Sequence, residues 1–336
     1  MTVSILGFSV YLIGIAFAPI YTPHLSERFG RRVVYFCSLP VCAMFLIGTG
    51  ASQSFAALAV CRFFAGFAGG PCLVLIEGTF ADLWSPAYTV TYYSFLTLAS
   101  YIGAACGMNL LPLSGSALTF FIGPLVGGFV VTDKGWRWTS WVPLMLIAVV
   151  YGFGGMMPET YPREILRRRA RKAGVPHNLP KAQSGVTIGE MAHLTIVQPV
   201  VMLFVDPITF FSTLYVAFIF GTVFQWFIAV PPVLMATYDF TLQQAGLAFI
   251  AAIGGAVLAA ASSILIERIA YPREVKKSGH KGIADIEYRF LPAILGSIFI
   301  TAALFWIGWT AKPSVSWASP VLGTGLFVWG NMMILV

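Results

Sequence analysis

Charged side chains are scarce in this sequence. Only 10% of its 336 residues are charged and 58% are apolar, whereas soluble domains carry about 25% charged residues. This composition leaves too little polar surface for a soluble protein of this size. The sequence also lacks the alternation of apolar and polar residues that is typical of barrel strands. Helices remain as the structure that satisfies backbone groups in lipid.

Groups that could carry catalysis or bind a metal are also few. The cysteines show no CxxC spacing and lie within apolar segments, where we interpret them as reduced packing residues. The histidines lie in expected loops, so they form no catalytic arrangement with residues of the spans. We therefore expect no metal, no cofactor and no enzymatic site. The residues concerned are Cys37, Cys42, Cys61, Cys72 and Cys106, and His24, His177, His193 and His280.

Long apolar runs dominate the sequence instead. A helix needs about 20 apolar residues to cross a hydrocarbon core of roughly 30 Å. Nine segments approach this length: 3–22, 33–51, 56–78, 91–132, 137–157, 207–230, 244–266, 290–310 and 317–336. The first lacks the basic flank of a signal peptide and is interpreted as a permanent helix. The sequence predicts an all-α membrane protein with about nine spans.

The basic residues are distributed unevenly between alternate loops. Most of the 20 Lys and Arg residues lie in loops 23–32, 79–90, 158–206 and 267–289. This pattern places those loops in the cytosol. The net charge of +7 thus reflects membrane topology, and we expect no nucleic-acid partner. Two crossings within 91–132 would export the later basic loops, so we predict one long helix there, interrupted near Asn109–Gly115.

The longest polar stretch separates five spans from four. It predicts an N-terminal bundle over 1–157, a cytosolic basic linker over 158–206 and a C-terminal bundle over 207–336, a layout typical of transporters. Within the linker, Arg163–Lys172 predicts an amphipathic basic helix at the inner leaflet. That helix is either a solvated anchor or a binding site for anionic lipids, to which each basic residue contributes about 1 kcal/mol.

The turn Pro23–Arg32 is the most specific local feature. Gly30 permits a tight turn with positive φ, and Arg31 and Arg32 can anchor helix ends at the membrane surface. Glu27 is placed to pair with an arginine across the turn or on a neighbouring helix. A plain hairpin between two spans is the alternative interpretation.

This turn resembles a motif of the major facilitator superfamily, in the form found in fungal drug:proton antiporters of the twelve-helix type. Four further stretches resemble the same family in the same order. The resemblance implies a two-bundle helical transporter and covers nearly the whole chain. The stretches are Cys61–Gly70, Gly123–Gly128 with Gly135–Trp138, Pro158–Tyr161, and Glu287–Arg289 with Phe305–Thr310.

The chain departs from the family pattern at three places. By resemblance, one helix is missing before residue 1 and two are missing after residue 336. The segment Met108–Phe121 has no counterpart, and we expect it to bulge from the bundle as an irregular stretch because it contains Pro112 and Gly115. A non-transporting fragment of such a transporter is therefore one alternative interpretation of the function.

The resemblance assigns roles to several residues. It implies a conformational-switch motif of Glu27, Gly30, Arg31, Arg32 and Asp82, with Asp82 paired to Arg31 or Arg32. It implies a helix-packing motif of Gly66, Gly70, Gly123, Pro124, Gly127 and Gly128, where small residues let helices approach closely. It also favours a cavity-facing Arg62 in proton coupling or substrate binding; snorkelling to the outer interface is the alternative.

Polar residues of other spans extend the expected coupling or substrate cavity. Tyr215, Gln225 and Trp226 suit amphipathic organic cations or other drug-like molecules, although Trp226 also fits an interfacial anchor. Glu77 is either a protonatable group or a side chain that reaches the cytosolic interface.

Together these features favour a secondary active transporter that exports drug-like or polyamine-like molecules in exchange for protons. Protonation of Glu27, Glu77 or Asp82 would bias its conformational equilibrium. Its expected partners are a small-molecule substrate, protons and membrane lipids, and its expected location is the plasma membrane. A membrane receptor and a membrane-bound enzyme are the remaining alternatives.

Charge reversal should show whether the turn Pro23–Arg32 acts as a conformational switch or only sets the membrane topology. Reversal of Arg31 or Arg32 is expected to impair transport more than reversal of Arg168 or Arg169, because the first pair lies in a tight turn within reach of acidic groups. The measurement is substrate efflux by a full-length transporter. Equal tolerance of both changes would reduce the turn to a topology signal.

Overall fold

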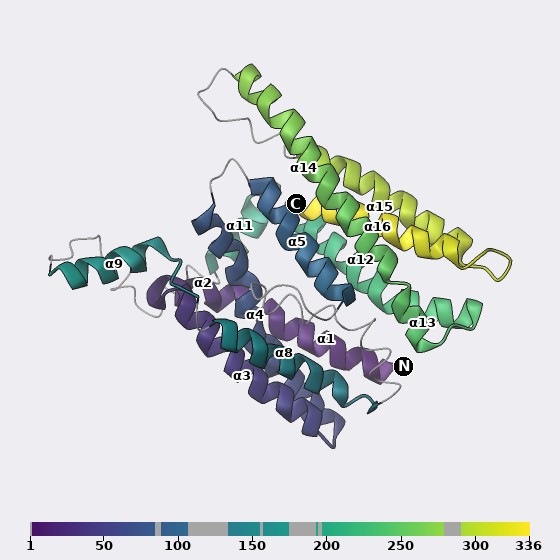
Figure 1. Ribbon diagram of the computed structural model, residues 1–336, viewed down its shortest axis with the longest axis horizontal. Coiled ribbons are helices and arrows are strands. Elements are labelled where there is room, and N and C mark those ends of the chain that lie inside the picture. The colour runs from purple at the N-terminus through teal and green to yellow at the C-terminus, as the bar shows by residue number, and fades with distance from the viewer. Residues whose placement is uncertain are drawn as a thin grey trace. The chain divides into compact units, whose positions relative to one another are not determined.

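The computed structural model describes residues 2–84, 89–106, 134–154, 157–174, 193, 197–278 and 290–336. Every regular element within these residues is a helix (Figure 1), which confirms the predicted all-α class. Within the described part of the chain, seven helical stretches are long and apolar enough to cross a membrane. The helices are α1 (Thr2–Ala16), α2 (Ala18–Phe29), α3 (Arg31–Ala51), α4 (Phe55–Leu83), α5 (Thr89–Cys106), α8 (Trp138–Gly154), α9 (Pro162–Ala173), α11 (Gln198–Val205), α12 (Pro207–Tyr238), α13 (Leu242–Leu247), α14 (Ile250–Ser278), α15 (Phe290–Thr310) and α16 (Ala318–Leu335).

Several helices continue beyond their apolar segments. α2 includes most of the turn predicted at 23–32, α4 extends to Leu83, and α14 extends to Ser278. The predicted loop bounds were wrong there because hydropathy marks the hydrocarbon region, whereas a helix can continue through the interface into water. His24 therefore lies in a helix rather than in a loop.

The long segment 91–132 is described only in part. Its first portion forms α5. The predicted break at Asn109–Gly115 and the irregular stretch Met108–Phe121 lie outside the described residues. The single crossing of this segment remains a prediction.

The chain divides into two compact units. The first contains Met1–Leu83 with Ser140–Thr222, and the second contains Trp84–Thr139 with Val223–Val336. α5 belongs to the second unit because it packs on α14 and α16, although it precedes the linker in sequence. The division into bundles at 1–157 and 207–336 stays a prediction.

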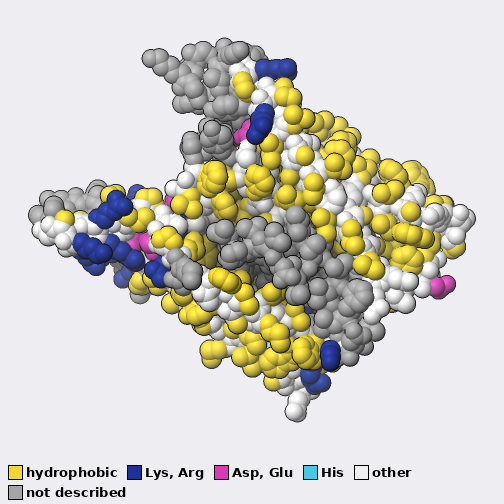
Figure 2. Space-filling model, in the orientation of Figure 1, with side chains coloured by type: hydrophobic (Ala, Val, Ile, Leu, Met, Phe, Trp, Pro, Cys, Tyr) yellow, Lys and Arg dark blue, Asp and Glu magenta, His cyan; other side chains and the backbone are white. Residues whose placement is uncertain are grey.

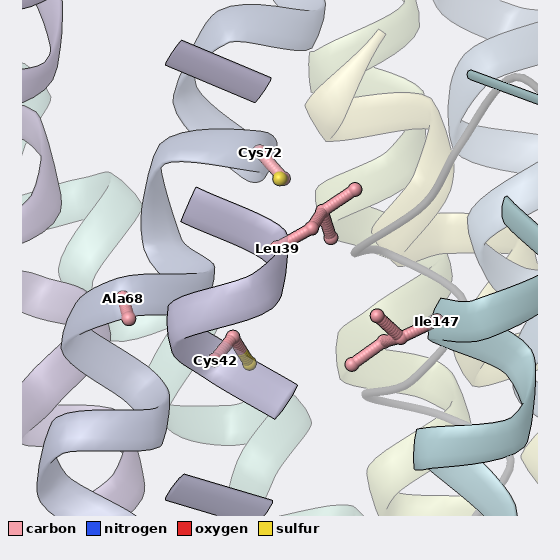
Figure 3. Close-up of a cluster of buried hydrophobic side chains, with 5 residues drawn as sticks. All are labelled: Leu39, Cys42, Ala68, Cys72 and Ile147. Carbon is pink, nitrogen blue, oxygen red and sulfur yellow. The ribbon is translucent and has the colours of Figure 1, made fainter. Parts of the chain in front are cut away.

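The core of the first unit lies where α3, α4 and α8 meet (Figure 3). Leu39 and Cys42 come from α3, Ala68 and Cys72 from α4, and Ile147 from α8. Cys42 and Cys72 are buried members of this cluster, which confirms their interpretation as packing residues.

Glycines set the closest helix contacts in both units. A Cβ atom at Gly66 of α4 would overlap the carbonyl oxygen of Tyr11 on α1, and a Cβ atom at Gly70 would overlap the side chain of Ala18 on α2. In the second unit, Gly255 of α14 meets Gly325 of α16 in the same way. These backbones approach more closely than any larger residue allows.

The molecular surface is mainly apolar over the spans and basic over α9 (Figure 2). The predicted basic helix is confirmed as α9, which has no buried residues. Leu166 on this helix is also exposed.

Substitution of a glycine by alanine should destabilise the protein where the glycine packs against another helix, and should have little effect where there is open space. We expect Gly66→Ala to destabilise the protein by about 1–3 kcal/mol, because the added carbon meets backbone atoms of α1 that cannot rotate away. Gly152→Ala on α8 is the matched control, since nothing lies within 4 Å of a Cβ atom there. Thermal unfolding in detergent measures both; similar midpoints for the two variants would contradict the expectation.

Candidate functional site

The turn between α2 and α3 consists of Gly30 alone. Its φ is +91°, which confirms the positive value predicted for this position, and its N–H donates to the carbonyl oxygen of Ser26 at 2.9 Å. A Cβ atom at Gly30 would lie 2.5 Å from Oε2 of Glu159. Glycine is thus required both by the backbone conformation and by the neighbouring carboxylate.

Glu159 lies at the N-terminus of α3. Its Oε1 accepts hydrogen bonds from the backbone N–H groups of Arg31 (2.9 Å), Thr160 (3.2 Å) and Tyr161 (3.2 Å). A carboxylate in this place satisfies a free amide of the helix and interacts favourably with its dipole. Glu159 was not among the predicted site residues, although a signal was present: an acid between Pro158 and Thr160 at the exit of a span.

Arg31 joins this carboxylate to α4. Its Nε donates to Oδ2 of Asp82 at 2.6 Å, and both side chains are mostly buried, with 14% and 19% exposed. The absence of a side chain at Gly78 leaves room for the guanidinium, and the Tyr161 ring centroid is 5.7 Å from Cζ of Arg31. Of the two pairings predicted for Asp82, with Arg31 or with Arg32, the structure shows the contact with Arg31, and its role in a conformational switch stays a prediction.

The same network reaches α9. Arg168 Nη2 lies 3.8 Å from Oε2 of Glu159, and its Nε donates to Oε1 of Glu164 at 3.0 Å. Glu159 therefore lies between the backbone amide of Arg31 and the guanidinium of Arg168. One buried carboxylate connects the basic helix to the turn. Arg168 is therefore part of the network rather than of a redundant basic surface, and Arg169 is the better comparison for charge reversal at Arg31.

Other members of the predicted switch motif lie elsewhere. Glu27 is exposed, and no ion pair joins it to an arginine within the part of the chain that the structure describes. Arg32 lies over the ring of Phe36, with Cζ 5.6 Å from the centroid. Arg31 is thus the residue of this pair that the structure shows bonded to Asp82.

The residues predicted to line a cavity do not form one group. Arg62 is partly buried, and its Nη1 lies 3.5 Å from the Cβ position of Gly7 on α1. Glu77, Tyr215 and Gln225 are exposed, whereas Trp226 is buried. Gly123, Pro124, Gly127 and Gly128 lie outside the described residues.

Trp226 lies in an aromatic cluster of the second unit. Its ring stacks on Phe327 of α16 at a centroid distance of 5.2 Å and meets Phe249 edge-on at 5.1 Å. Only 4% of Trp226 is exposed. Its indole lies among aromatic side chains of neighbouring helices in the second unit, rather than at an exposed position.

Two polar contacts attach α5 to its neighbours in the second unit. Thr91 donates to Oε2 of Glu267 on α14 at 2.6 Å, and Tyr101 donates to Oδ1 of Asn331 on α16 at 2.6 Å. None of these residues was predicted from the sequence. Glu267 lies in a segment predicted as a loop, and no spacing pattern in the sequence distinguishes Tyr101 or Asn331 from the other polar residues of their spans.

Long apolar helices and close packing at glycines are typical of an integral membrane protein, and this one carries a buried charge network at a one-residue turn. A sequence profile of the Major Facilitator Superfamily matches residues 1–113 and 113–336. The chain belongs to the Major Facilitator Superfamily, a family of transporters rather than enzymes. It is a multi-pass membrane protein.

Curated fungal proteins match nearly the whole chain. The protein named efflux pump FUBT of Fusarium oxysporum is 30% identical over 347 residues, covering 99% of this chain and 54% of its own length. Transporter mfs1 of Schizosaccharomyces pombe is 29% identical over 98% of this chain and 61% of its own length. Polyamine transporter 4 of Saccharomyces cerevisiae is 28% identical over 99% and 52%. The chain thus spans about half the length of these relatives.

Solved transporter structures share the fold. The human organic anion transporter MFSD10 superposes with a TM-score of 0.59 at 20% identity, covering 98% of this chain and 67% of that one. A D-xylose–proton symporter gives a TM-score of 0.54 at 16% identity, covering 97% and 69%. At these identities the likeness establishes the helical transporter fold alone.

Removal of the Glu159 carboxylate should weaken the turn more than removal of a surface acid. We expect Glu159→Ala to lower stability by about 0.5–2 kcal/mol, because the first amide of α3 loses its acceptor. Glu164→Ala is the control, since Glu164 pairs only with Arg167 and Arg168 of its own helix, whose side chains are 44% exposed, and pairs of this kind contribute about 0–1 kcal/mol. Thermal unfolding in detergent measures the difference, and equal effects would exclude the capping role.

Proposed function

We propose that this protein is a secondary active transporter that exports drug-like or polyamine-like small molecules in exchange for protons. The observation that carries the proposal is the Arg31–Asp82 ion pair beside Glu159, found in a chain of the Major Facilitator Superfamily. Two relatives bear the names efflux pump and polyamine transporter, which supports export and this range of substrates. We place the protein in the plasma membrane.

The ion pair suits a conformational latch. It joins the first residue of α3 to the end of α4, and Glu159 ties the same residue to the chain that enters α9. Alternating access moves helical bundles around a central site, so contacts at helix ends must form in one state and break in another. A partly buried, charge-assisted hydrogen bond has sufficient strength for this purpose while remaining reversible.

In this scheme, protonation of a carboxylate shifts the equilibrium between the conformations of the transporter. A neutral Asp82 would lose the ionic part of its bond to Arg31, which releases the latch. Glu77 lies on the same helix, five residues before Asp82, and its side chain is exposed, as is that of Glu27. Arg62 on α4 is the cationic candidate for interaction with substrate or with the proton pathway.

The test is transport by the protein reconstituted in liposomes with an imposed pH gradient. We expect uptake of labelled spermidine or of a neutral lipophilic dye to follow the gradient and to stop when a protonophore collapses it. Transport that is indifferent to the gradient would remove proton coupling from the proposal.

Glu77→Gln should separate proton coupling from folding. If Glu77 carries the proton, the variant is expected to lose most gradient-driven transport, because the amide cannot titrate, while its thermal stability stays close to that of the unaltered protein. Glu164→Gln on α9 is the control, since Glu164 forms surface ion pairs. Full gradient-driven transport by Glu77→Gln would assign the coupling to another carboxylate.

A further inference from the structure

The exposed helix α9 carries more positive charge than its neighbours neutralise. Six of its twelve residues are basic, and Figure 2 shows these side chains gathered over α9. Glu164 pairs with Arg167 and Arg168. The other four basic residues pair with no carboxylate among the described residues; they are Arg163, Arg169, Arg171 and Lys172.

One side of α9 combines apolar residues with two of these unpaired cations. Leu166 is 52% exposed, and Ala170 and Ala173 follow it at helical spacing, four and seven residues later. Arg163 and Arg169 stand three residues before and after Leu166, so they flank it on the helix surface. We call the side formed by these five residues the Leu166 face.

The Leu166 face points away from the contact that α9 makes with the turn. Arg168, whose guanidinium lies 3.8 Å from Glu159, is two residues after Leu166, or about 200° around the helix. No residue of α9 is buried, and Figure 1 shows the helix extending away from the ends of α2 and α3. The described part of the chain therefore leaves the Leu166 face uncovered.

α9 also lies close to the end of a membrane-crossing segment. It begins at Pro162, shortly after α8 ends at Gly154, and the distribution of basic residues predicts the cytosolic side for this loop. The cytosolic leaflet is negatively charged and attracts basic residues near its surface. Arginine, which supplies most of the charge of α9, binds phosphate oxygens through two parallel hydrogen bonds. The charge of α9 is thus complementary to this leaflet.

We propose that the Leu166 face is a docking surface for the cytosolic leaflet. Arg163 and Arg169 bind the phosphate groups of anionic phospholipids, and Leu166 enters the boundary between headgroups and acyl chains. A helix with basic residues beside an apolar line lies in this plane of a membrane. The surface is independent of the proposed transport function, because it contains none of the residues assigned to coupling or to substrate.

Hydrogen–deuterium exchange of the purified protein in lipid nanodiscs tests the docking surface. Exchange of the α9 amides is compared between nanodiscs of phosphatidylcholine alone and nanodiscs that also contain phosphatidylserine. Two arginines bound to the anionic surface should slow this exchange by at least about tenfold, and added salt should weaken the effect. The amides of α3 and α4 are the internal reference and should exchange equally in both.

Substitutions on two sides of α9 test which side meets the lipid. Arg163→Gln should reduce the effect of phosphatidylserine by about fivefold, and Leu166→Gln by about threefold or more. Arg171→Gln is the matched control, since Arg171 is five residues from Leu166, or about 140° around the helix, where salt screens most of its attraction to the leaflet. The ratio of exchange rates in the two kinds of nanodisc removes differences in helix propensity between the variants.

Equal exchange of α9 in the two kinds of nanodisc would overturn the proposal and identify α9 as a solvated helix. Equal losses in Arg163→Gln and Arg171→Gln would also overturn it, since diffuse attraction requires no defined face. If a soluble acidic peptide protects α9 in neutral nanodiscs as strongly as phosphatidylserine does, the surface fits a protein partner instead. The measurement requires neither a substrate nor a proton gradient, so its outcome is separate from that of the transport assay.

Discussion

A polar side chain that enters the hydrocarbon region must find its partner within the protein, because lipid offers none. Isolated hydroxyl groups meet this condition locally: Thr49 donates to the carbonyl oxygen of Phe45, and Thr97 to that of Tyr93, each one turn earlier in its own helix. Groups too large or too charged for a local bond need a second helix, and this holds also at the ends of the spans. Arg31 with Asp82 and Thr91 with Glu267 are such pairs, and they join helices that apolar packing alone would hold with little specificity.

Local features of this structure could be predicted from sequence, whereas contacts between distant segments could not. Gly30 was predictable because a one-residue turn between two helices demands a positive φ. Asp82 was predictable as a partner of Arg31 because the family resemblance supplied the pairing. Glu159 lies 128 residues from Arg31, and no periodicity within either segment reports that they meet. The importance of Glu159 appears only when its hydrogen bonds are seen.

The faces of the apolar helices could not be predicted for a different reason. A helix that is apolar on every side carries no moment from which its inward face can be read. Tyr215, Gln225 and Trp226 share one apolar helix and were grouped by composition, yet Trp226 alone of the three is buried. The face of α12 that turns inward is set by Phe249 and Phe327, which contact Trp226 from separate parts of the chain. The rotation of α12 about its own axis is therefore set by tertiary contacts and not by its own sequence.

α4 carries the proposed latch at its end and the packed glycines of the first unit in its interior. One helix carries Arg62, the glycines that meet α1 and α2, and Asp82. Arg62 and Asp82 are 20 residues apart in the sequence, or about 30 Å along the axis, which is roughly the thickness of the hydrocarbon core. Pro71 lies inside this helix and is buried. Because proline removes one backbone hydrogen bond, the helix can bend there, so movement at the Asp82 end need not shift the tightly packed glycines before it.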